Sequence, residues 1–246
     1  MSHRLNILAI ESSGSPLSIA VLKSDSTQPQ QFFLKSSNET TRSSEVIVPM
    51  ISEVLQEALL EPKDLHAIAI SQGPGSFTSL RVGMSVAKGL SLALEVPIIA
   101  LPTLTLFYRY SLSLSPLQEK TIAYRLAIQH LKSEEFYYAL FQEGAFKDAI
   151  DTGYATASEI IALVKAVQNE KQTKCDLVVK ESNLAQRFFS DLDPLLLTGL
   201  TAESMLEWAS EKYLAKEFAD TETLIPLYIK EFEARKSNKS VFSKKM

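Results

Sequence analysis

Residues 71–94 read SQGPGSFTSLRVGMSVAKGLSLAL, and they are the most informative stretch of the chain. A short apolar segment runs into Gly73-Pro74-Gly75, and a long apolar helix follows. Clustered glycines before a helix let the backbone turn sharply and approach other atoms closely, because no Cβ stands in the way. The helix is apolar nearly all round, so it must be buried on more than one side. One side can lie on its own sheet, and the other needs a second layer from this chain or from a partner.

The apolar pattern outside this stretch predicts a mixed sheet covered by helices. Expected in the first half are strands at 5–10, 17–22, 31–35, 66–71 and 97–101, and helices at 44–60 and 79–94. Expected in the second half are helices at 103–112, 157–168, 183–190 and 202–217, and strands at 121–129, 135–142 and 176–179. We expect an N-terminal lobe of residues 1–105 completed by the helix at about 202–218, a smaller lobe of residues 106–200, and a C-terminal segment of residues 219–246.

The composition indicates a globular protein of a reducing compartment. At 246 residues the chain is long enough for one large or two modest domains. The single cysteine, Cys175, leaves no internal disulfide, and no apolar run reaches the length of about 18 residues that a membrane span needs. The first residues indicate a strand rather than a cleaved signal. We therefore expect a cytoplasmic protein with no membrane partner.

The charge distribution is uneven along the chain. The net charge is −4, which argues against general binding to polyanions. Residues 234–246 nevertheless carry five basic side chains and no acid. Two interpretations of this tail are open: a solvated terminus, or an electrostatic arm for an RNA-bearing complex.

Residues that could carry catalysis are few and scattered. Cys175 precedes a predicted strand and is interpreted as a small core residue. The sequence contains no G-x-S-x-G motif, which would mark a nucleophilic serine. His3, His66 and His130 lie in three separate segments, so no pair has the i, i+4 spacing of a helical zinc site. We expect neither a nucleophile nor a metal site.

The glycine-rich loop suggests phosphate binding at a helix N-terminus, but the detailed patterns are absent. Thr78 stands where the dinucleotide fingerprint has its third glycine, and Lys88 precedes Gly89 instead of following it in a Walker-type loop. Two interpretations remain open. The loop is either a tight strand-to-helix turn, or part of a nucleotide or subunit interface.

Two stretches resemble the TsaB family. GPGSFTSLRVGMSVAKGL (73–90) is similar to the family's signature, and LNILAIESSGSPLSIAVL (5–22) resembles its first hairpin. Weaker similarity covers SSEVIVPMISEVL (43–55), EEFYYALF (134–141) and PLYIK (226–230). The family is a branch of the actin/Hsp70-like ATPase superfold. The resemblance therefore implies an α/β, two-lobed, actin/Hsp70-like (ribonuclease H-like) fold with mixed sheets flanked by helices.

The resemblance also implies a function. TsaB-like proteins are accessory subunits in the formation of N6-threonylcarbamoyladenosine at position 37 of tRNAs that read ANN codons. They bind and activate a TsaD-like catalytic subunit, a TsaE-like ATPase joins the complex, and tRNA is contacted through the complex. A homodimer is expected when the partner is absent. TsaD-like proteins carry a metal-binding histidine pair on a helix, and because this chain lacks one it resembles the non-catalytic paralogue. The chain is expected to have no cofactor of its own. The resemblance also implies a site for ATP or ADP with Mg²⁺ at or near the subunit interface.

The superfold places an acid after its first strand, near a metal-bound phosphate, and Glu11 stands there in this chain. An equally simple interpretation of Glu11 is an acid that caps the hairpin turn. The expected nucleotide or cleft residues are Glu11, Ser12, Gly73, Gly75, Ser76 and Thr78. The chain departs from the family pattern at Ser43, where a histidine is common, at Ser79, where a third loop glycine is usual, and at Gln129 and His130, where an aspartate is expected.

If the chain is non-catalytic, its function must lie in a surface, and the two N-terminal helices are the candidates. Small residues in the second helix would let a partner helix approach closely. The expected partner-interface residues are Ile47, Met50, Ile51, Leu80, Gly83, Val86, Ala87 and Leu90. The alternative is that the C-terminal helix, with Met205 and Tyr213, covers this face internally.

Two rival functions are considered. The first is an active ATPase or small-molecule kinase of the superfold, using Glu11 and the loop at 73–78, and ATP turnover lost in Glu11→Ala would favour it. The second is a glycoprotease-like hydrolase, for which the sequence provides no nucleophile, base or metal ligand set.

Overall fold

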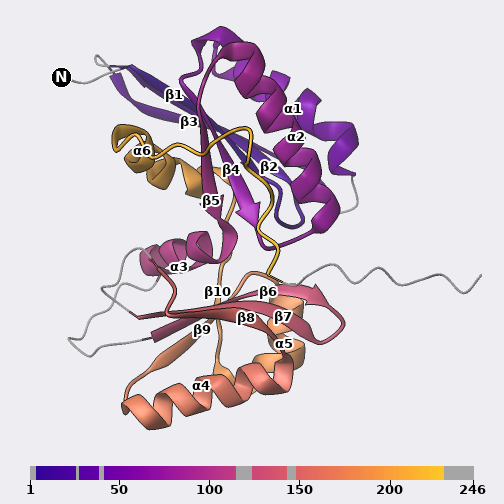
Figure 1. Ribbon diagram of the computed structural model, residues 1–246, viewed down its shortest axis with the longest axis vertical. Helices are drawn as coiled ribbons and strands as arrows, with labels where there is room; N and C mark the ends of the chain where they lie inside the picture. The colour runs from indigo at the N-terminus through magenta and orange to yellow at the C-terminus, as the bar shows by residue number, and fades with distance from the viewer. Residues whose placement is uncertain (1–3, 26–27, 39–41, 115–123, 143–147, 230–246) are drawn as a thin grey trace, which may run out of the picture.

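Two five-stranded sheets, one in each lobe, form the framework of the computed structural model (Figure 1). The structure describes residues 4–229 without 26–27, 39–41, 115–123 and 143–147. The expected two-lobed α/β architecture with mixed sheets is confirmed. No helix in these described ranges is long and apolar enough to cross a membrane.

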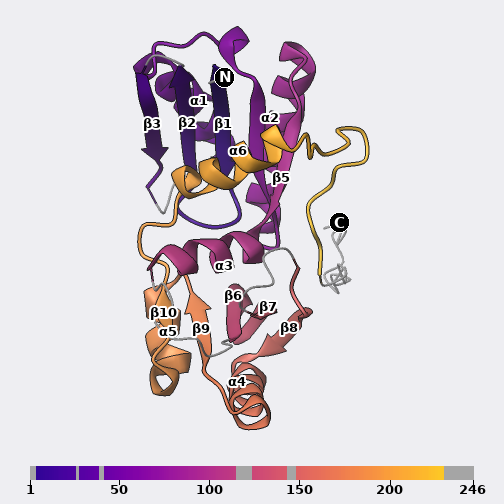
Figure 2. The ribbon, with the colours of Figure 1, turned by 90° about the vertical axis from the view of Figure 1, so that its left-hand side faces the viewer.

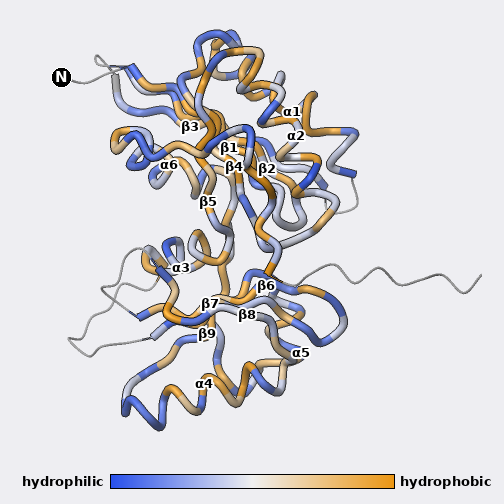
Figure 3. Tube along the Cα trace, viewed as in Figure 1, coloured by the Kyte–Doolittle hydropathy of each residue, from blue (hydrophilic) through white to orange (hydrophobic). Residues whose placement is uncertain are grey.

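The first sheet has the order β3-β2-β1-β4-β5. Its strands are β1 (Leu5–Glu11), β2 (Ser18–Asp25), β3 (Gln28–Ser36), β4 (Ala67–Gly73) and β5 (Ile98–Pro102). β1 pairs antiparallel with β2 and parallel with β4, so it lies at the centre, and every one of its residues is buried. This central position explains why β1 is apolar apart from Asn6 and Glu11, because both of its faces are covered. In Figure 3, β1 and β4 are accordingly hydrophobic segments.

The second sheet repeats this arrangement. Its strands are β6 (Tyr124–Lys132), β7 (Glu135–Gln142), β8 (Asp151–Thr156), β9 (Cys175–Val179) and β10 (Leu195–Leu196). The order is β8-β7-β6-β9-β10, with an antiparallel β6–β7–β8 meander and parallel β6–β9–β10 pairing. Each lobe is therefore a meander of three strands followed by two parallel strands. The sequence itself shows no repeat, so the duplication is visible only in the topology.

Helices cover both faces of the first sheet, as two views show (Figures 1 and 2). One face carries α1 (Ser43–Glu57) and α2 (Phe77–Leu94), and the other carries α3 (Thr103–Leu114) and α6 (Leu206–Leu214). Helices α4 (Ala157–Lys171) and α5 (Ser182–Phe189) pack on the second sheet, and 3-10 turns lie at Pro62–Asp64 (η1), Ser190–Leu192 (η2) and Ala202–Met205 (η3). Alternate residues of β1 serve the two faces, since Ile7 faces α3 and α6 whereas Leu8 faces α1 and α2.

The two lobes share one hydrophobic core through these helices. α3 follows the first sheet in the chain but also packs on the second, where Tyr108 stacks on Phe141 with ring centroids 4.4 Å apart. α6 follows the second sheet but returns to the first. Just before α6, the Ala202 N–H donates to the Ser18 hydroxyl of β2, at 2.9 Å. α3 therefore lies between the two sheets, and α6 packs on the first lobe although it follows the second lobe in the sequence.

Several element boundaries differ from the sequence prediction. α2 begins at Phe77 instead of 79, and the predicted helix at 202–217 is a 3-10 turn followed by a helix that ends at Leu214. β8 and β10 were not predicted. β8 is a polar and largely exposed strand without an apolar alternation, and β10 has only two residues, so neither carries a periodic signal.

The C-terminal segment returns along α2 after α6 has ended. Its Ala219 N–H donates to the Ile98 carbonyl at 2.8 Å, and its Leu227 N–H donates to the Gln72 carbonyl at the same distance. The proposed internal cover by the C-terminal helix is wrong, because α6 lies on the opposite face of the sheet from α2. The basic tail at 234–246 lies outside the described residues.

Candidate functional site

The glycine-rich loop between β4 and α2 packs directly on the β1–β2 hairpin of its own lobe. The Ser76 N–H donates to the Ser13 carbonyl at 2.7 Å. A Cβ added at Gly75 would lie 2.1 Å from the same carbonyl oxygen, and one added at Gly83 would lie 2.3 Å from the Ser12 hydroxyl. These glycines are required because the chain approaches itself, which supports the interpretation as a tight strand-to-helix turn.

Glu11 lies in a buried polar cluster under this loop. Glu11, Ser12 and Ser13 are fully buried, and Glu11 Oε1 accepts hydrogen bonds from the N–H and the hydroxyl of Ser13. The Ser12 N–H donates to the Ser71 hydroxyl at 2.9 Å. Glu11 therefore holds the hairpin turn, as one of the two sequence interpretations has it. In the described part of the chain, Glu11 Oε2 and Ser12 Oγ have no hydrogen-bond partner.

The residues around the loop do not fit a metal-bound nucleotide held by this chain alone. A magnesium ion bound with a nucleotide usually takes one or two protein carboxylates besides the phosphates. Glu11 is enclosed, and no cluster of three or more His, Cys, Asp or Glu residues suited to a metal occurs among the described residues.

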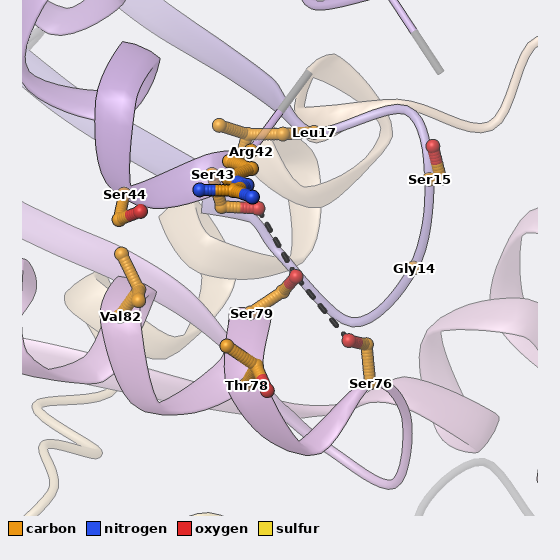
Figure 4. Close-up of a pocket in the computed structure, with 10 residues that line it drawn as sticks. All are labelled: Gly14, Ser15, Leu17, Arg42, Ser43, Ser44, Ser76, Thr78, Ser79 and Val82. Atoms are coloured by element: carbon orange, nitrogen blue, oxygen red, sulfur yellow. Dashed lines mark hydrogen bonds between the residues drawn. The ribbon is translucent and has the colours of Figure 1, made fainter. Parts of the chain in front are cut away.

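An open pocket of about 360 Å³ lies beside the loop, where the N-termini of α1 and α2 converge (Figure 4). Ser76 and Thr78 line it, whereas Gly73, at the end of β4 with φ of +107°, does not and instead lies beside Leu80 and Leu227. Neither helix has a side-chain cap at its first turn, and Arg42 at the rim pairs with Glu45 of the same turn at 3.6 Å. Helix N-termini attract negative charge, so the chemistry of this pocket suits an anion.

Two departures from the family pattern meet in this pocket. The Ser43 hydroxyl of α1 donates to the Ser79 hydroxyl of α2 at 3.0 Å, and Ser76 donates to the same Ser79 oxygen at 3.2 Å (Figure 4). The serine at 43 and the serine at 79 therefore form one contact, although 36 positions separate them. The two departures from the family pattern therefore alter the same site in the structure.

The remaining departure lies in the second lobe, opposite the hairpin. Gln129 is buried and donates to Glu181 at 3.4 Å, and Gln129 Nε2 would lie 3.8 Å from a Cβ added at Gly14. His130 instead turns toward the β6–β7 turn, where its Nε2 lies 3.2 Å from the Ser133 carbonyl. The structure thus brings Gln129, and not His130, to the junction of the lobes.

Most of the predicted partner-interface residues lie in the core, and the prediction is corrected for them. The buried residues are Ile47, Met50, Ile51, Leu80, Gly83 and Ala87. They pack against the sheet or its hairpin, so their side chains are not available to a partner of the folded chain. Val86 and Leu90 are half-buried beside α1 and remain accessible.

The exposed side of α2 carries a row that the prediction did not single out. Ser85, Gly89 and Ala93 recur every four residues and are exposed, and Leu92 is 81% exposed beside them. A Cβ added at Gly89 would meet nothing within 4 Å. Among the described residues, Gly89 therefore makes room for no neighbour, although a glycine in a helix costs about 1 kcal/mol relative to alanine. We define the docking face as Val82, Ser85, Val86, Gly89 and Ala93.

Cys175 is part of the core and not a nucleophile. Its side chain is 4% exposed in β9, and burial, with a smaller contribution from Asp176, raises the pKa of the thiol to about 12. The thiolate is the reactive form, so we expect no reaction of the native protein with a thiol reagent such as DTNB at about pH 8. Denaturant should release one reactive thiol per chain. Rapid labelling of the native protein would contradict the buried placement of Cys175.

Solved structures share this fold. A Pseudomonas aeruginosa protein described as uncharacterized with similarity to peptidase YEAZ superimposes with a TM-score of 0.71 and 20% identity, over 92% of this chain and 100% of that one. YeaZ from Pseudomonas aeruginosa gives a TM-score of 0.69 at 20% identity, over 91% and 99% of the two chains. The two mixed sheets with their flanking helices, together with these neighbours, define a two-lobed α/β protein with the actin/Hsp70-like (ribonuclease H-like) fold.

Sequence relatives narrow this class to one family. Residues 38–118 match the family model described as TsaD, tRNA N6-adenosine threonylcarbamoyltransferase. The tRNA threonylcarbamoyladenosine biosynthesis protein TsaB of Buchnera aphidicola is 30% identical over 73% of this chain and 76% of its own. The protein of that name from Haemophilus influenzae is 27% identical over 93% and 94% of the two chains. The chain belongs to the TsaB family.

Proposed function

We propose that this chain is the non-catalytic subunit of a complex that forms N6-threonylcarbamoyladenosine at position 37 of tRNAs reading ANN codons. Its role is to bind and activate a TsaD-like catalytic subunit. The names of its relatives support the pathway. The observation that supports the subunit role is the docking face, where an exposed glycine in mid-helix leaves space that no described residue fills.

The chemistry of the docking face suits a helix of a partner protein. Val82 and Val86 supply apolar surface, while Ser85, Gly89 and Ala93 keep the backbone close to the surface. Small residues in this arrangement let a second helix approach closely and gain van der Waals contacts along its length. A homodimer through the same face follows when the partner is absent, and it competes with the heterodimer.

The other components of the complex are those that the resemblance to the TsaB family implies. A TsaE-like ATPase joins the pair, and tRNA is bound through the complex rather than by this chain alone. ATP or ADP with Mg²⁺ at the subunit interface would take its metal ligands from the partner, because Glu11 of this chain is enclosed. The anion-suited pocket between α1 and α2 is the place in this lobe where a phosphate would fit.

Affinity purification of the tagged full-length protein from its own cells, followed by native mass spectrometry, tests the proposal. We expect a stoichiometric TsaD-like subunit, and we expect depletion of the chain to lower N6-threonylcarbamoyladenosine in total tRNA. A protein without a partner, together with unchanged tRNA modification after depletion, would contradict the proposal. ATP turnover by the purified chain that is lost in Glu11→Ala would then favour the ATPase alternative.

A further inference from the structure

A second open surface lies on the side of the first sheet opposite to the docking face. It is a groove of about 930 Å³ between β3, α3 and α6, three elements that border one region in Figure 2. We call it the α6 groove. Phe32 and Leu34 of β3 line it with exposed fractions of 47% and 37%, and Leu214 at the end of α6 is 69% exposed. Apolar side chains of this size are usually covered when they gather in one groove.

The polar residues of the α6 groove give it a negative charge. Glu203, Glu207 and Glu211 follow one another at intervals of four along η3 and α6, so they lie on one side. Arg109 is the basic residue of the lining, and it pairs with Glu211 at 2.6 Å. In the described part of the chain, Glu203 and Glu207 form no ion pair. The groove therefore presents apolar surface next to two uncompensated carboxylates.

This charge decides what kind of occupant fits. A nucleic acid would bring phosphates against Glu203 and Glu207, and the repulsion disfavours it. A second copy that used the same groove would place the same carboxylates opposite each other. A segment with basic and apolar side chains is complementary in both respects.

The chain itself carries such a segment. Residues 234–246 read ARKSNKSVFSKKM, with Val241 and Phe242 between Lys239 and Lys244. The described chain ends at Ile229, which packs against the core cluster that also backs the groove through Leu206 and Trp208. Residues 230–241 can span up to about 40 Å, more than twice the radius of gyration of about 18 Å expected for a chain of this length.

We propose that residues 234–246 bind in the α6 groove of their own chain. Val241 and Phe242 cover Phe32 and Leu34, and the lysines lie beside the glutamates of η3 and α6. The attachment of the segment to the chain gives it a millimolar effective concentration, so even a weak contact is populated. Because the attraction is between exposed charges, it depends on salt.

Trp208 reports on this contact, because it is the single tryptophan of the chain and lines the groove. The test compares acrylamide quenching of Trp208 fluorescence in four full-length proteins: wild type, Lys239→Glu/Lys244→Glu, Glu203→Lys/Glu207→Lys, and the combination of all four changes. We expect quenching to be about twofold stronger in each double variant at low salt, to return to the wild-type level in the combination, and to become equal in all four at about 1 M NaCl. Glu134→Lys/Glu170→Lys, two exposed acids of the second lobe, is the control for Glu203→Lys/Glu207→Lys, because it changes the net charge by the same amount, and it should be quenched as wild type is.

Each other outcome overturns the proposal. Equal quenching in wild type and the tail variant at low salt would show that the segment does not cover Trp208. A wild-type value that changes on dilution would assign the contact to a second copy. If quenching in the combined variant did not return to the wild-type level, the tail would not pair with Glu203 and Glu207. Lower affinity of the tail variant for RNA, with unchanged quenching, would assign the tail to RNA instead.

Discussion

Gly75→Ala is expected to lower the free energy of unfolding by about 3 to 5 kcal/mol, which would leave little of the stability of an ordinary domain. The added Cβ would lie 2.1 Å from the carbonyl oxygen of Ser13 and 2.8 Å from its carbonyl carbon. Both are backbone atoms, so no side chain can rotate out of the way. Separation of the two loops would also break the hydrogen bond from the Ser76 N–H to the Ser13 carbonyl.

Gly89→Ala is the matched control, because the same substitution in the neighbouring helix meets open space. We expect it to raise the free energy of unfolding by about 0.5 to 1 kcal/mol, since alanine restricts the unfolded chain and favours the helix. Chemical denaturation followed by circular dichroism measures both changes. Similar values for the two variants would show that the loop does not pack on the hairpin as the structure has it.

The strands and helices of the first lobe were predictable from sequence because their apolar residues recur with a clear period. β1 is an unbroken buried run, and α1 carries Ile47, Met50, Ile51 and Val54 on one face. The class of fold followed from the order of these elements and from the resemblance of two motifs. The two short or polar strands of the second lobe were not predictable, since pairing with neighbours, and not their own composition, makes them strands.

The faces of α2 were not predictable in the same way. Small residues occur all round this helix, so its sequence does not say which side lies on the sheet. Gly83 and Gly89 look alike in sequence, but the first accommodates Ser12 of the hairpin and the second faces open space. The contact between Ser43 and Ser79 likewise depends on the angle at which two helix N-termini meet. Such contacts join residues that are distant in sequence and carry no local signal.

The difference between buried and exposed positions of α2 determines which substitutions can test the docking face. Ala87 is fully buried, so Ala87→Arg is expected to unfold the lobe and says nothing about a partner. A buried charge without a partner costs several kcal/mol, on the order of the whole stability of a domain. An informative variant must add bulk or charge where the chain itself has space, and Gly89 is such a position.

Gly89→Arg is expected to weaken binding of the TsaD-like subunit by about 100-fold or more while the free energy of unfolding does not fall, and rises by up to about 1 kcal/mol because arginine favours the helix more than glycine does. The arginine side chain points into solvent in the free chain, where a Cβ meets no atom within 4 Å. In the complex it would occupy the space that the partner helix needs, and a guanidinium forced into an apolar helix contact without a carboxylate is strongly disfavoured. Titration calorimetry with the purified partner measures the affinity.

The control for this experiment is Ala166→Arg, which places the same side chain on an exposed position of α4 in the second lobe. It should bind the partner as wild type does, because it lies on a helix of the other lobe. Gly89→Ala provides a graded intermediate, since it should stabilise the free chain and weaken the complex at once. Damage to the fold would lower both the stability of the free chain and its affinity for the partner. Higher stability of Gly89→Ala together with lower affinity would therefore locate the partner on this face. Full affinity of Gly89→Arg would move the interface away from α2 and leave the exposed glycine without a role.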